Sequence, residues 1–467
     1  MQFNQHHLNC KEGRMRSAEA RLKTPPGAGF FANFGVSELA GMMRSGLMTP
    51  ADLVEIALQE AHRWQPSINA FVSFDENGAH AAASKARTEL ASGIDRGPLH
   101  GIPVAVKDVI DVRGMPTTAG SRHRKNHLAR ENAECVERLV QAGAIIIGKT
   151  TTHEFANGPT GDRSATGPTR NPHDTDHMAG GSSSGSAAAV AAGIIPLALG
   201  TDTGGSARIP ASCCGVVGLK PTHGALPTRG MVPLAPSLDT IGLLARTAAD
   251  CLLLWTALRG TRTIALPPGI GWIKPDSIYP TQPSITCTVR SRVDQLLTGE
   301  ADVQEASDLR EAYRIIQGSE AYAQHSELIF NSPELYDPEV LARLLSGGEI
   351  PGWEYVKAME LRHSARQRIQ PLLNRYGVLA LPTIPLTPPR LNSRMEFIDG
   401  SSLETRKALL SLTSPWSVLG LPAISIPAGT AEGLPAGLQL IGPPGAESQL
   451  LRVAAQIEET QYPMKGN

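Results

Sequence analysis

The sequence predicts an α/β fold in which a large mixed β-sheet is covered on both faces by α-helices. From about residue 95, short apolar runs bounded by Gly and Pro alternate with helical stretches rich in small residues. Runs that are apolar throughout, without alternating polar residues, are typical of strands buried on both faces. The predicted strands are residues 102–106, 144–147, 194–199, 378–381, 423–426 and 438–441.

Helices are predicted between these strands and before them. An early helix is expected to begin at Pro50, because Thr49 is a good N-cap and Asp52 completes a capping box. Other predicted helices are residues 135–142, 186–192, 248–258 and 448–458. Residues 1–30 are expected to form a weakly ordered extension, and residues 31–467 one large domain. Within that domain, residues 260–375 are more polar and are expected to form a helical region that wraps the sheet or covers a site.

Composition narrows the class of protein. The 467 residues carry 43 Lys and Arg against 44 Asp and Glu, so no basic surface for nucleic acid or anionic lipid is indicated. No run approaches the roughly 18 apolar residues that a membrane span needs. The six cysteines form no C-x-x-C pair, which favours a reduced, cytoplasmic enzyme.

Residues Gly143–Thr150 satisfy the G-x-x-x-x-G-K-[ST] pattern of a phosphate-binding loop, which would suggest a nucleotide-binding protein. That mechanism needs a flexible loop whose N–H groups surround a phosphate. Here the middle of the pattern holds three consecutive isoleucines, which are stiff, β-branched residues suited to a strand. A buried strand is therefore the favoured interpretation of this segment.

Residues Gly181–Gly185 match the G-x-S-x-G pattern of a nucleophile elbow, whose nucleophile would be Ser183. An elbow requires a strand directly before it, whereas Gly167–Gly180 reads as a loop rich in Pro, Asn, Asp and His. The same residues are also compatible with a flexible Gly/Ser linker or a serine-capped helix start.

A second serine, Ser206, follows an apolar strand and a Gly204-Gly205 turn. Glycines allow several backbone N–H groups to point into one concavity, as in an oxyanion hole, and a serine beside such a nest is well placed to be a nucleophile. An ordinary strand-end turn explains the pattern equally well.

Lys107 ends a buried apolar run, where an unpaired ammonium group would be costly. It either forms a salt bridge at the end of the strand or acts as a base whose pKa is lowered by desolvation. No histidine stands in a familiar triad context, and lysine is an accepted replacement for histidine in serine catalysis. Lys107, a serine of the Gly181–Gly185 loop and Ser206 would together suffice for such a mechanism.

At these residues the sequence resembles the amidase signature family. The resemblance is carried by Met178–Gly193, Leu199–Ala211 and Gly215–Thr222. Family-like segments also occur at Gly101–Ser121, Gly148–Gly158 and Gly420–Gly442, so the similarity extends from about residue 35 to residue 460. It implies the amidase-signature fold and hydrolysis of a carboxamide, with esters as side substrates.

The resemblance also implies roles for individual residues. Ser206 would be the acylated nucleophile, Ser182 a bridging serine held by a cis peptide bond, and Lys107 the base. Backbone N–H groups around Thr203, Gly204, Gly205 and Ser206 would form the oxyanion hole, and the Ala156 carbonyl would contact substrate. No metal or organic cofactor is required, and the expected partners are a small-molecule amide and a second copy in a homodimer.

Two departures from the family pattern affect these expectations. Ser184 stands where the family loop normally has glycine, which puts the loop geometry in question. The A subunit of glutamyl-tRNA(Gln) amidotransferase, the main alternative within the family, holds the glutamine amino group with an acidic residue, and Leu410 stands at that position. A stand-alone amidase is therefore favoured. A catalytically inactive assembly protein is disfavoured, because such a protein has no need for Lys107, Ser182 and Ser206.

Overall fold

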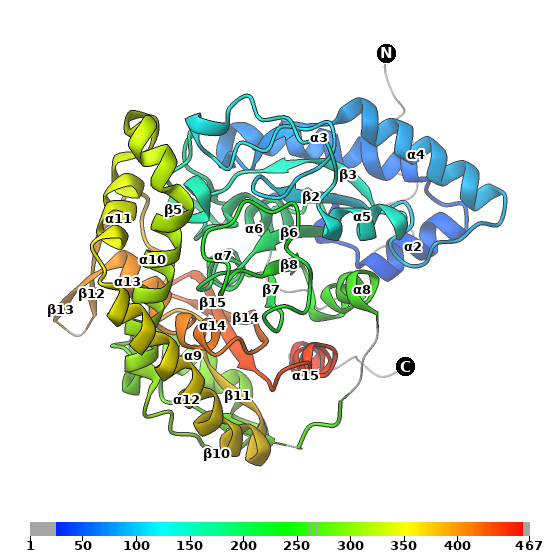
Figure 1. Ribbon diagram of the computed structural model, residues 1–467. Coiled ribbons are helices and arrows are strands. Elements are labelled where there is room, and N and C mark those ends of the chain that lie inside the picture. Colours follow the sequence, from blue (N-terminus) through cyan, green and yellow to red (C-terminus); the bar gives the residue numbers. More distant parts are fainter. Residues whose placement is uncertain (1–24, 261–263, 268, 399, 461–467) are drawn as a thin grey trace.

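Eleven strands form one mixed sheet through the centre of the computed structural model (Figure 1), which describes residues 25–260, 264–267, 269–398 and 400–460. The strands lie in the order β1 (Phe71–Phe74), β3 (Ile145–Thr150), β2 (Pro103–Lys107), β6 (Leu197–Thr201), β8 (Ile241–Ala245), β7 (Val217–Lys220), β14 (Ala423–Ala431), β15 (Leu434–Ile441), β11 (Gly377–Pro382), β9 (Gly269–Trp272) and β10 (Leu297–Glu300). The β3–β2–β6 and β11–β9–β10 neighbours are parallel and the others antiparallel.

Helices account for most of the remaining chain. They are α2 (Val36–Arg44), α3 (Pro50–Ile68), α4 (Glu76–Ala91), α5 (Glu134–Gln141), α6 (Ser184–Ala191), α7 (Arg208–Cys214), α8 (Ala248–Arg259), α9 (Pro283–Val293), α10 (Ala306–Asn331), α11 (Pro338–Gly348), α12 (Gly352–Tyr376), α13 (Thr405–Ser411), α14 (Ser414–Val418) and α15 (Glu447–Thr460). Two small hairpins, β4 (Arg170–Asn171) with β5 (Asp174–Met178) and β12 (Met395–Ile398) with β13 (Ser401–Glu404), lie outside the main sheet.

The predicted α/β class is confirmed, and each predicted strand corresponds to a strand of the main sheet. The predicted capping box is also present: the Asp52 amide donates to Thr49 Oγ1 at 3.2 Å, and the Thr49 amide donates to Asp52 Oδ2 at 2.8 Å. Strands β7 and β8 were not predicted, because glycine interrupts their short apolar runs and weakens the strand pattern.

Helices α9 to α12 lie in the stretch 260–376, which also contributes β9 and β10 at one edge of the sheet. Helices α10, α11 and α12 pack together on the left of Figure 1. The predicted extension over residues 1–30 falls mainly on residues 1–24, which lie outside the described residues.

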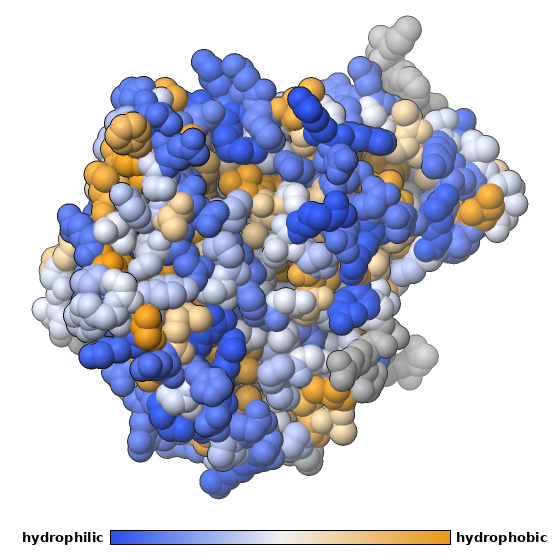
Figure 2. Space-filling model, viewed as in Figure 1, coloured by the Kyte–Doolittle hydropathy of each residue, from blue (hydrophilic) through white to orange (hydrophobic). Residues whose placement is uncertain are grey.

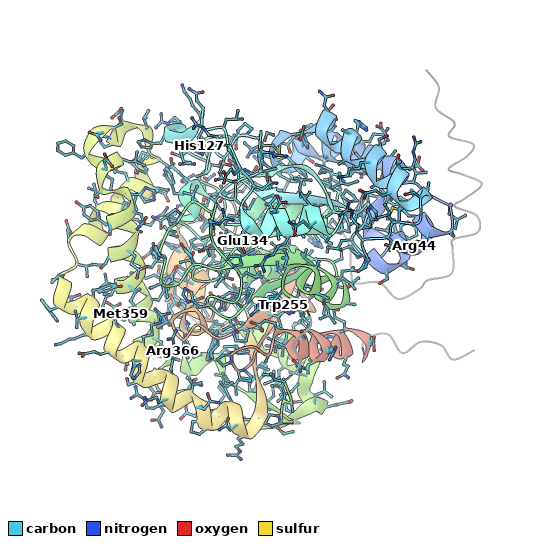
Figure 3. The ribbon with its side chains drawn as sticks, turned by 45° about the vertical axis from the view of Figure 1, so that its right-hand side comes forward. Arg44, His127, Glu134, Trp255, Met359 and Arg366 are labelled. Atoms are coloured by element: carbon cyan, nitrogen blue, oxygen red, sulfur yellow. The ribbon has the colours of Figure 1, made fainter. Side chains whose placement is uncertain are left out.

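Helices α6 and α7 pack against each other and against central strands, while α8 and α15 form another packed pair over β7 and β14. Trp255 of α8 lies between α8 and α15 (Figure 3), and its indole N–H donates to Ser448 Oγ at 3.2 Å. Burying such an aromatic side chain with its N–H satisfied fixes the two helices against each other. Within the described residues, no helix is long and apolar enough to cross a membrane.

The surface is mostly hydrophilic in the view of Figure 2, with apolar side chains gathered over α10 and α11 at the upper left. Exposed apolar residues of these helices include Phe330 and Leu345. The buried core lies instead between the sheet and its helices, where the central strands β2 and β6 carry fully buried residues. These two strands position the candidate site.

Candidate active site

Lys107 is the last residue of β2 and is completely buried. Its neighbour β6 runs parallel and ends at Thr201, so both residues lie at the same edge of the sheet. Lys107 Nζ lies 2.7 Å from Ser182 Oγ and 2.6 Å from Thr201 Oγ1. Thr201 was not identified from the sequence, because a threonine at the end of a strand carries no signal of its own.

Burial lowers the pKa of Lys107 to about 7, although the carboxylates of Asp202 and Asp239 raise it in part. Removing an ammonium group from water favours its neutral form. No carboxylate among the described residues forms an ion pair with Lys107, in contrast to Lys149, whose Nζ lies 3.2 Å from Asp108 Oδ1. An amine with such a pKa accepts a proton near neutral pH.

Ser182 stands in the loop directly before α6, and the Gly181–Ser182 peptide bond is cis, as the family resemblance implies. The side chain of the next serine binds the backbone of β6: Ser183 Oγ donates to the Thr201 carbonyl at 3.1 Å and accepts from the Thr201 amide at 3.2 Å. A nucleophile elbow at Ser183 is therefore not supported by its geometry.

Ser184 occupies the glycine position of the family loop without disrupting it. Its hydroxyl donates to Thr169 Oγ1 at 3.0 Å, and the residue begins helix α6. A methyl group added at Gly161 would lie 2.7 Å from Ser184 Cβ, so the extra side chain fits because glycine faces it. The loop therefore accommodates serine at this position, because the Ser184 side chain is packed and hydrogen-bonded.

Ser206 lies in the turn between β6 and α7 and is 7% exposed. Its carbonyl accepts from the Ser183 amide at 3.1 Å, which places the two serine loops side by side. Its hydroxyl has no hydrogen-bond partner among the described residues, and it makes no direct bond to Ser182. Catalytic hydrogen bonds are often open without substrate and close in the Michaelis complex.

The backbone N–H groups of the turn are also unused. Within the described part of the chain, those of Thr203, Gly204, Gly205 and Ser206 have no acceptor. Successive free N–H groups beside a serine hydroxyl are the arrangement that stabilises a developing oxyanion.

Buried charged residues fix the conformation of the turn between β6 and α7. Asp202 and Arg208 form a completely buried ion pair at 2.9 Å, and Asp202 Oδ2 also accepts from the Ala207 amide at 3.2 Å. Thr203 Oγ1 donates to Asp239 Oδ1 at 2.6 Å. The supporting roles of Asp202, Arg208 and Asp239 were not predicted from the sequence. The one available signal was that Asp202 and Arg208 are charged residues close to Ser206 in the sequence.

Ala156, the expected substrate contact, is the last residue of a tight turn, Glu154–Ala156, beside Ser182. Phe155 and Ala156 have φ values of 50° and 58°, a conformation that costs non-glycine residues on the order of 1 kcal/mol each. The turn is held in place because the His153 amide donates to the Ser182 carbonyl at 3.2 Å and the Ala156 amide to the His153 carbonyl at 2.8 Å.

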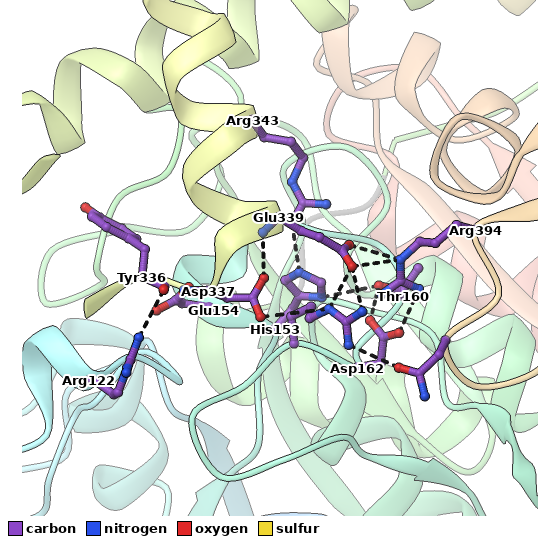
Figure 4. A network of polar contacts seen from close by, with 12 residues as sticks. Arg122, His153, Glu154, Thr160, Asp162, Tyr336, Asp337, Glu339, Arg343 and Arg394 are labelled. Carbon is purple, nitrogen blue, oxygen red and sulfur yellow. Dashed lines mark hydrogen bonds and ion pairs between the residues drawn. The ribbon is translucent and has the colours of Figure 1, made fainter. Parts of the chain in front are cut away.

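A network of polar side chains surrounds His153 (Figure 4). His153 Nε2 lies 3.1 Å from Arg343 Nη2, and Thr160 Oγ1 lies 3.5 Å from His153 Nδ1. Thr160 Oγ1 in turn donates to Asp162 Oδ1 at 2.6 Å. No sequence pattern indicated this network, since its members come from helix α11 and from loops far apart in the chain.

The alternative phosphate-binding site is not formed. Residues Ile145–Thr150 are strand β3 rather than a loop. Lys149 is fully buried and donates to the Pro116 carbonyl and to Thr117 Oγ1, both at 2.9 Å, besides its contact with Asp108. Its amino group is thereby occupied within the protein. No group of three or more metal-ligating side chains occurs among the described residues.

Known proteins are similar to this chain over most of its length. The amidase family model matches residues 52–264 and 275–451. The chain is 35% identical to AtzE, a component of the 1-carboxybiuret hydrolase of Pseudomonas sp. (strain ADP), over 91% of this chain and 98% of that protein. It is 34% identical to the A subunit of the glutamyl-tRNA(Gln) amidotransferase of Symbiobacterium thermophilum over 90% of this chain and 95% of that protein.

A solved structure of 6-aminohexanoate cyclic dimer hydrolase superimposes with a TM-score of 0.80 at 26% identity, covering 92% of this chain and 97% of that one. Family model, relatives and fold all point to one group of amidohydrolases. The chain belongs to the amidase family, whose members carry the amidase signature, and it is an amidase that hydrolyses C–N amide bonds.

Proposed function

We propose that this amidase hydrolyses linear carboxamides through an acyl-enzyme on Ser206, releasing ammonia or an amine. The observation that carries the proposal is the 2.7 Å contact between Lys107 Nζ and Ser182 Oγ, in which a buried amine has its pKa lowered to about 7. Ser182 is then the bridge through which the amine acts on Ser206.

In this mechanism the neutral Lys107 amine takes the Ser182 hydroxyl proton while Ser182 takes that of Ser206. Ser206 Oγ attacks the amide carbonyl, forming a C–O bond. The proton returns through Ser182 to the departing nitrogen as the C–N bond breaks. Water then attacks the ester with the same relay as base, which releases the carboxylic acid and restores Ser206.

The negative charge of the tetrahedral intermediate would be met by the free N–H groups of residues 203–206. The tie between Thr203 and Asp239 and the buried pair of Asp202 and Arg208 fix those groups before substrate arrives. Preorganised donors need no rearrangement during the reaction. Because the same acyl-enzyme forms from an ester, esterase activity is proposed as a side reaction.

A glutaminase half of an amidotransferase is the second candidate, favoured by the identity with the amidotransferase relatives. Glutamine carries an ammonium group that needs an acidic partner. The expected position for it is Leu410, which is buried and apolar, with 8% of its surface exposed. Release of ammonia from glutamine by the purified chain, measured beside simple amides, separates the two candidates.

The decisive experiment is labelling with a fluorophosphonate probe, followed by intact-protein mass spectrometry and a peptide map. An adduct on Ser206 that is lost in Lys107→Ala is expected. An adduct on Ser183 instead would overturn the assignment of the nucleophile. Full labelling of Lys107→Ala at an unchanged rate would overturn the role of the lysine.

Three wider features belong to the same proposal. A homodimer is proposed as the assembly, which light scattering after gel filtration tests. A cytoplasmic location is supported by the adjacent buried thiols of Cys213 and Cys214, which are free. Residues 31–467 are proposed to fold as one domain, for which a single unfolding transition is expected.

A further inference from the structure

The turn that carries Ala156 is held in a conformation that its own residues disfavour. Phe155 and Ala156 both have left-handed φ values, which a bulky side chain such as that of Phe155 rarely adopts. Such strain persists only where the surrounding structure fixes the backbone, and it is concentrated at functional sites. Contacts from outside the turn must therefore hold it in place.

The backbone carbonyl of Ala156 has no hydrogen-bond donor among the described residues. Ala156 is 5% exposed, so this acceptor is largely removed from water as well, which is costly for a carbonyl. The His153 amide donates to the Ser182 carbonyl at 3.2 Å, so the turn lies beside the proposed proton relay. The unused carbonyl is thus an acceptor available to a bound substrate.

Three rings pack around the side chain of Phe155. The centroid of the Phe155 ring lies 4.4 Å from that of His325 in an edge-to-face contact, 5.6 Å from that of Tyr336 and 6.2 Å from that of His123. The His123 and Tyr336 centroids are 4.3 Å apart, and Tyr336 Oη lies 2.8 Å from His325 Nδ1. We call these four side chains the aromatic anchor. Rings at such separations attract each other, so the Phe155 side chain is fixed although its backbone is strained.

The anchor depends on residues 332–337, the segment that joins α10 to α11. The Arg122 side chain donates to three successive backbone carbonyls of this segment, at distances between 2.7 and 3.1 Å (Figure 4). The Asp337 amide donates to Glu154 Oε2 at 2.8 Å, which ties the segment to the residue before Phe155. These bonds hold Tyr336 against the turn, so the junction of the two helices determines where the turn lies.

The position of the Ala156 carbonyl bears on amides and not on esters. In the mechanism proposed above, the departing nitrogen takes its proton from Ser182 through its lone pair. An N–H of that nitrogen then points away from Ser182 and needs an acceptor. The ester oxygen that departs in the same step carries no hydrogen and needs none. A fixed Ala156 carbonyl therefore stabilises the tetrahedral intermediate of an amide and aligns its lone pair, with no effect on an ester.

We propose that the aromatic anchor holds the Ala156 carbonyl where it accepts a hydrogen bond from the N–H of the scissile amide. Tyr336 and His325 are then positioning residues that act through Phe155, and they favour amides over esters of the same acid. The inference rests on the proposed function, because the serine relay must act on the same bond. Since the contact forms fully only when the nitrogen becomes tetrahedral, it accelerates acylation more than it tightens binding.

The test compares benzamide and butyramide with the methyl esters of the same acids, by kcat/KM, which includes every step up to acylation. Phe155→Leu and Tyr336→Leu are expected to lower kcat/KM for the amides by about 5- to 100-fold, the range for a buried acceptor that loses its partner. The esters should react at nearly the wild-type rate. Tyr336→Phe keeps the ring and loses only the bond to His325, so its effect should be smaller. An equal loss for amides and esters would overturn the positioning role.

Tyr376→Leu is the matched control, because Tyr376 is a second buried tyrosine with one hydrogen bond, from its hydroxyl to the Glu300 carbonyl at 2.8 Å. It should lower the melting temperature without changing the ratio of amide to ester turnover. A ratio that falls as far as in Tyr336→Leu would assign the change to lost stability and refute the proposal. If Tyr336→Leu does not fold, unchanged ratios in both Phe155→Leu and Tyr336→Phe would refute it.

Hydrogen exchange separates a failure of this inference from a failure of the proposed function. No hydrolysis by the wild-type enzyme and no probe adduct on Ser206 would refute the proposed function. The anchor is then tested alone, by exchange of the backbone amides of residues 153–158 followed by mass spectrometry. Exchange in this segment should be faster in Tyr336→Leu than in wild type and unchanged in Tyr376→Leu. Equal exchange in Tyr336→Leu and wild type would overturn the anchor whatever the activity.

Discussion

The two sides of the site differ in whether their buried charged side chains have partners of opposite charge. Around Ser206 the buried Arg208 is paired with Asp202, and burial lowers the pKa of Lys107 to about 7, so its amine loses its charge more readily than an exposed lysine does. On the side of helices α11 and α13, Arg343 and Arg406 carry charges without carboxylate partners among the described residues. On the first side, buried charge is paired or removed within the protein, whereas on the second side two cations have no carboxylate partner in the part of the chain that the structure describes.

Ser206→Ala should have the largest effect, because it removes the proposed nucleophile from the first side. Turnover of any amide is expected to fall by at least about 10⁴-fold, with the melting temperature changed little. Steady-state kinetics and circular dichroism measure both. Ser183→Ala is the control: its hydroxyl bonds the Thr201 backbone, so a loss of stability with retained probe labelling is expected. Activity in Ser206→Ala equal to wild type would remove the basis of the proposed mechanism.

Lys107→Ala should lower kcat/KM by about 10²- to 10⁴-fold, the usual contribution of a general base. The pH profile sharpens the assignment. Only the neutral amine accepts a proton, so wild-type activity should rise as pH increases through about 7 and level off above it. Partial recovery of Lys107→Ala at high pH is expected, where hydroxide replaces the missing base. A wild-type profile that is flat between pH 5 and 9 would contradict this role.

Lys149→Met is the matched control, since Lys149 is a second fully buried lysine on the adjacent strand. Its amine is held by Asp108, and removing it leaves that buried carboxylate without its ion-pair partner, which costs about 3–5 kcal/mol of stability. The variant should therefore melt earlier while its remaining folded fraction keeps the wild-type pH profile. A shifted profile would assign the titration to the wrong lysine.

Gly204→Ala tests the boundary between the two sides. The added methyl group would lie 2.2 Å from Tyr313 Oη and 2.3 Å from Tyr313 Cζ, and this ring is almost fully buried. The turn must shift, and a displaced oxyanion donor lowers kcat by about 100-fold or more. Adding Tyr313→Ala should restore part of the loss by making room. Gly41→Ala, where nothing lies within 4 Å, should have no kinetic effect.

Lys107, Ser182 and Ser206 were predicted from the sequence, whereas Arg343 and Arg406 were not. Lys107 ends an apolar strand, Ser206 follows a Gly-Gly turn after another, and parallel pairing of β2 with β6 brings these two strand ends together. Ser182 stands in a loop rich in Gly and Ser. The three residues were grouped in the sequence by their chemistry and by the family resemblance, and the pairing of the strands is what the structure adds. Thr201 and Asp239 complete the arrangement, but threonine and aspartate are too common at strand ends and turns to be singled out.

Arg343 and Arg406 could not be predicted for a different reason. They lie on α11 and α13, and neither has a local pattern that separates it from the surface arginines of an amphipathic helix. Their lack of a carboxylate partner within the described structure depends on where every neighbouring acid points. The same limit applies to β7 and β8, whose assignment rests on neighbours in the sheet rather than on their own residues.

The smallest effect is expected for a substitution at Glu458 of α15. Burial raises the pKa of this carboxyl to about 8, although the Ala248 amide donates to its Oε2 at 2.8 Å and thereby opposes the rise. Because the folded state holds this proton more tightly than the unfolded state, the resulting stability is complete below pH about 4.5 and is lost as pH rises through about 8. Glu458→Gln keeps an acceptor for the amide and should remove this loss, gaining roughly 1–3 kcal/mol over wild type at pH 8 but little at pH 4.5. Melting curves of both proteins at the two pH values, with the exposed neighbour Glu459→Gln as control, measure the difference. A shifted pKa indicates a functional role only where the group also contacts the reacting residues, as Lys107 contacts Ser182. Turnover by Glu458→Gln is therefore expected to equal that of wild type, and a loss of turnover would contradict this expectation.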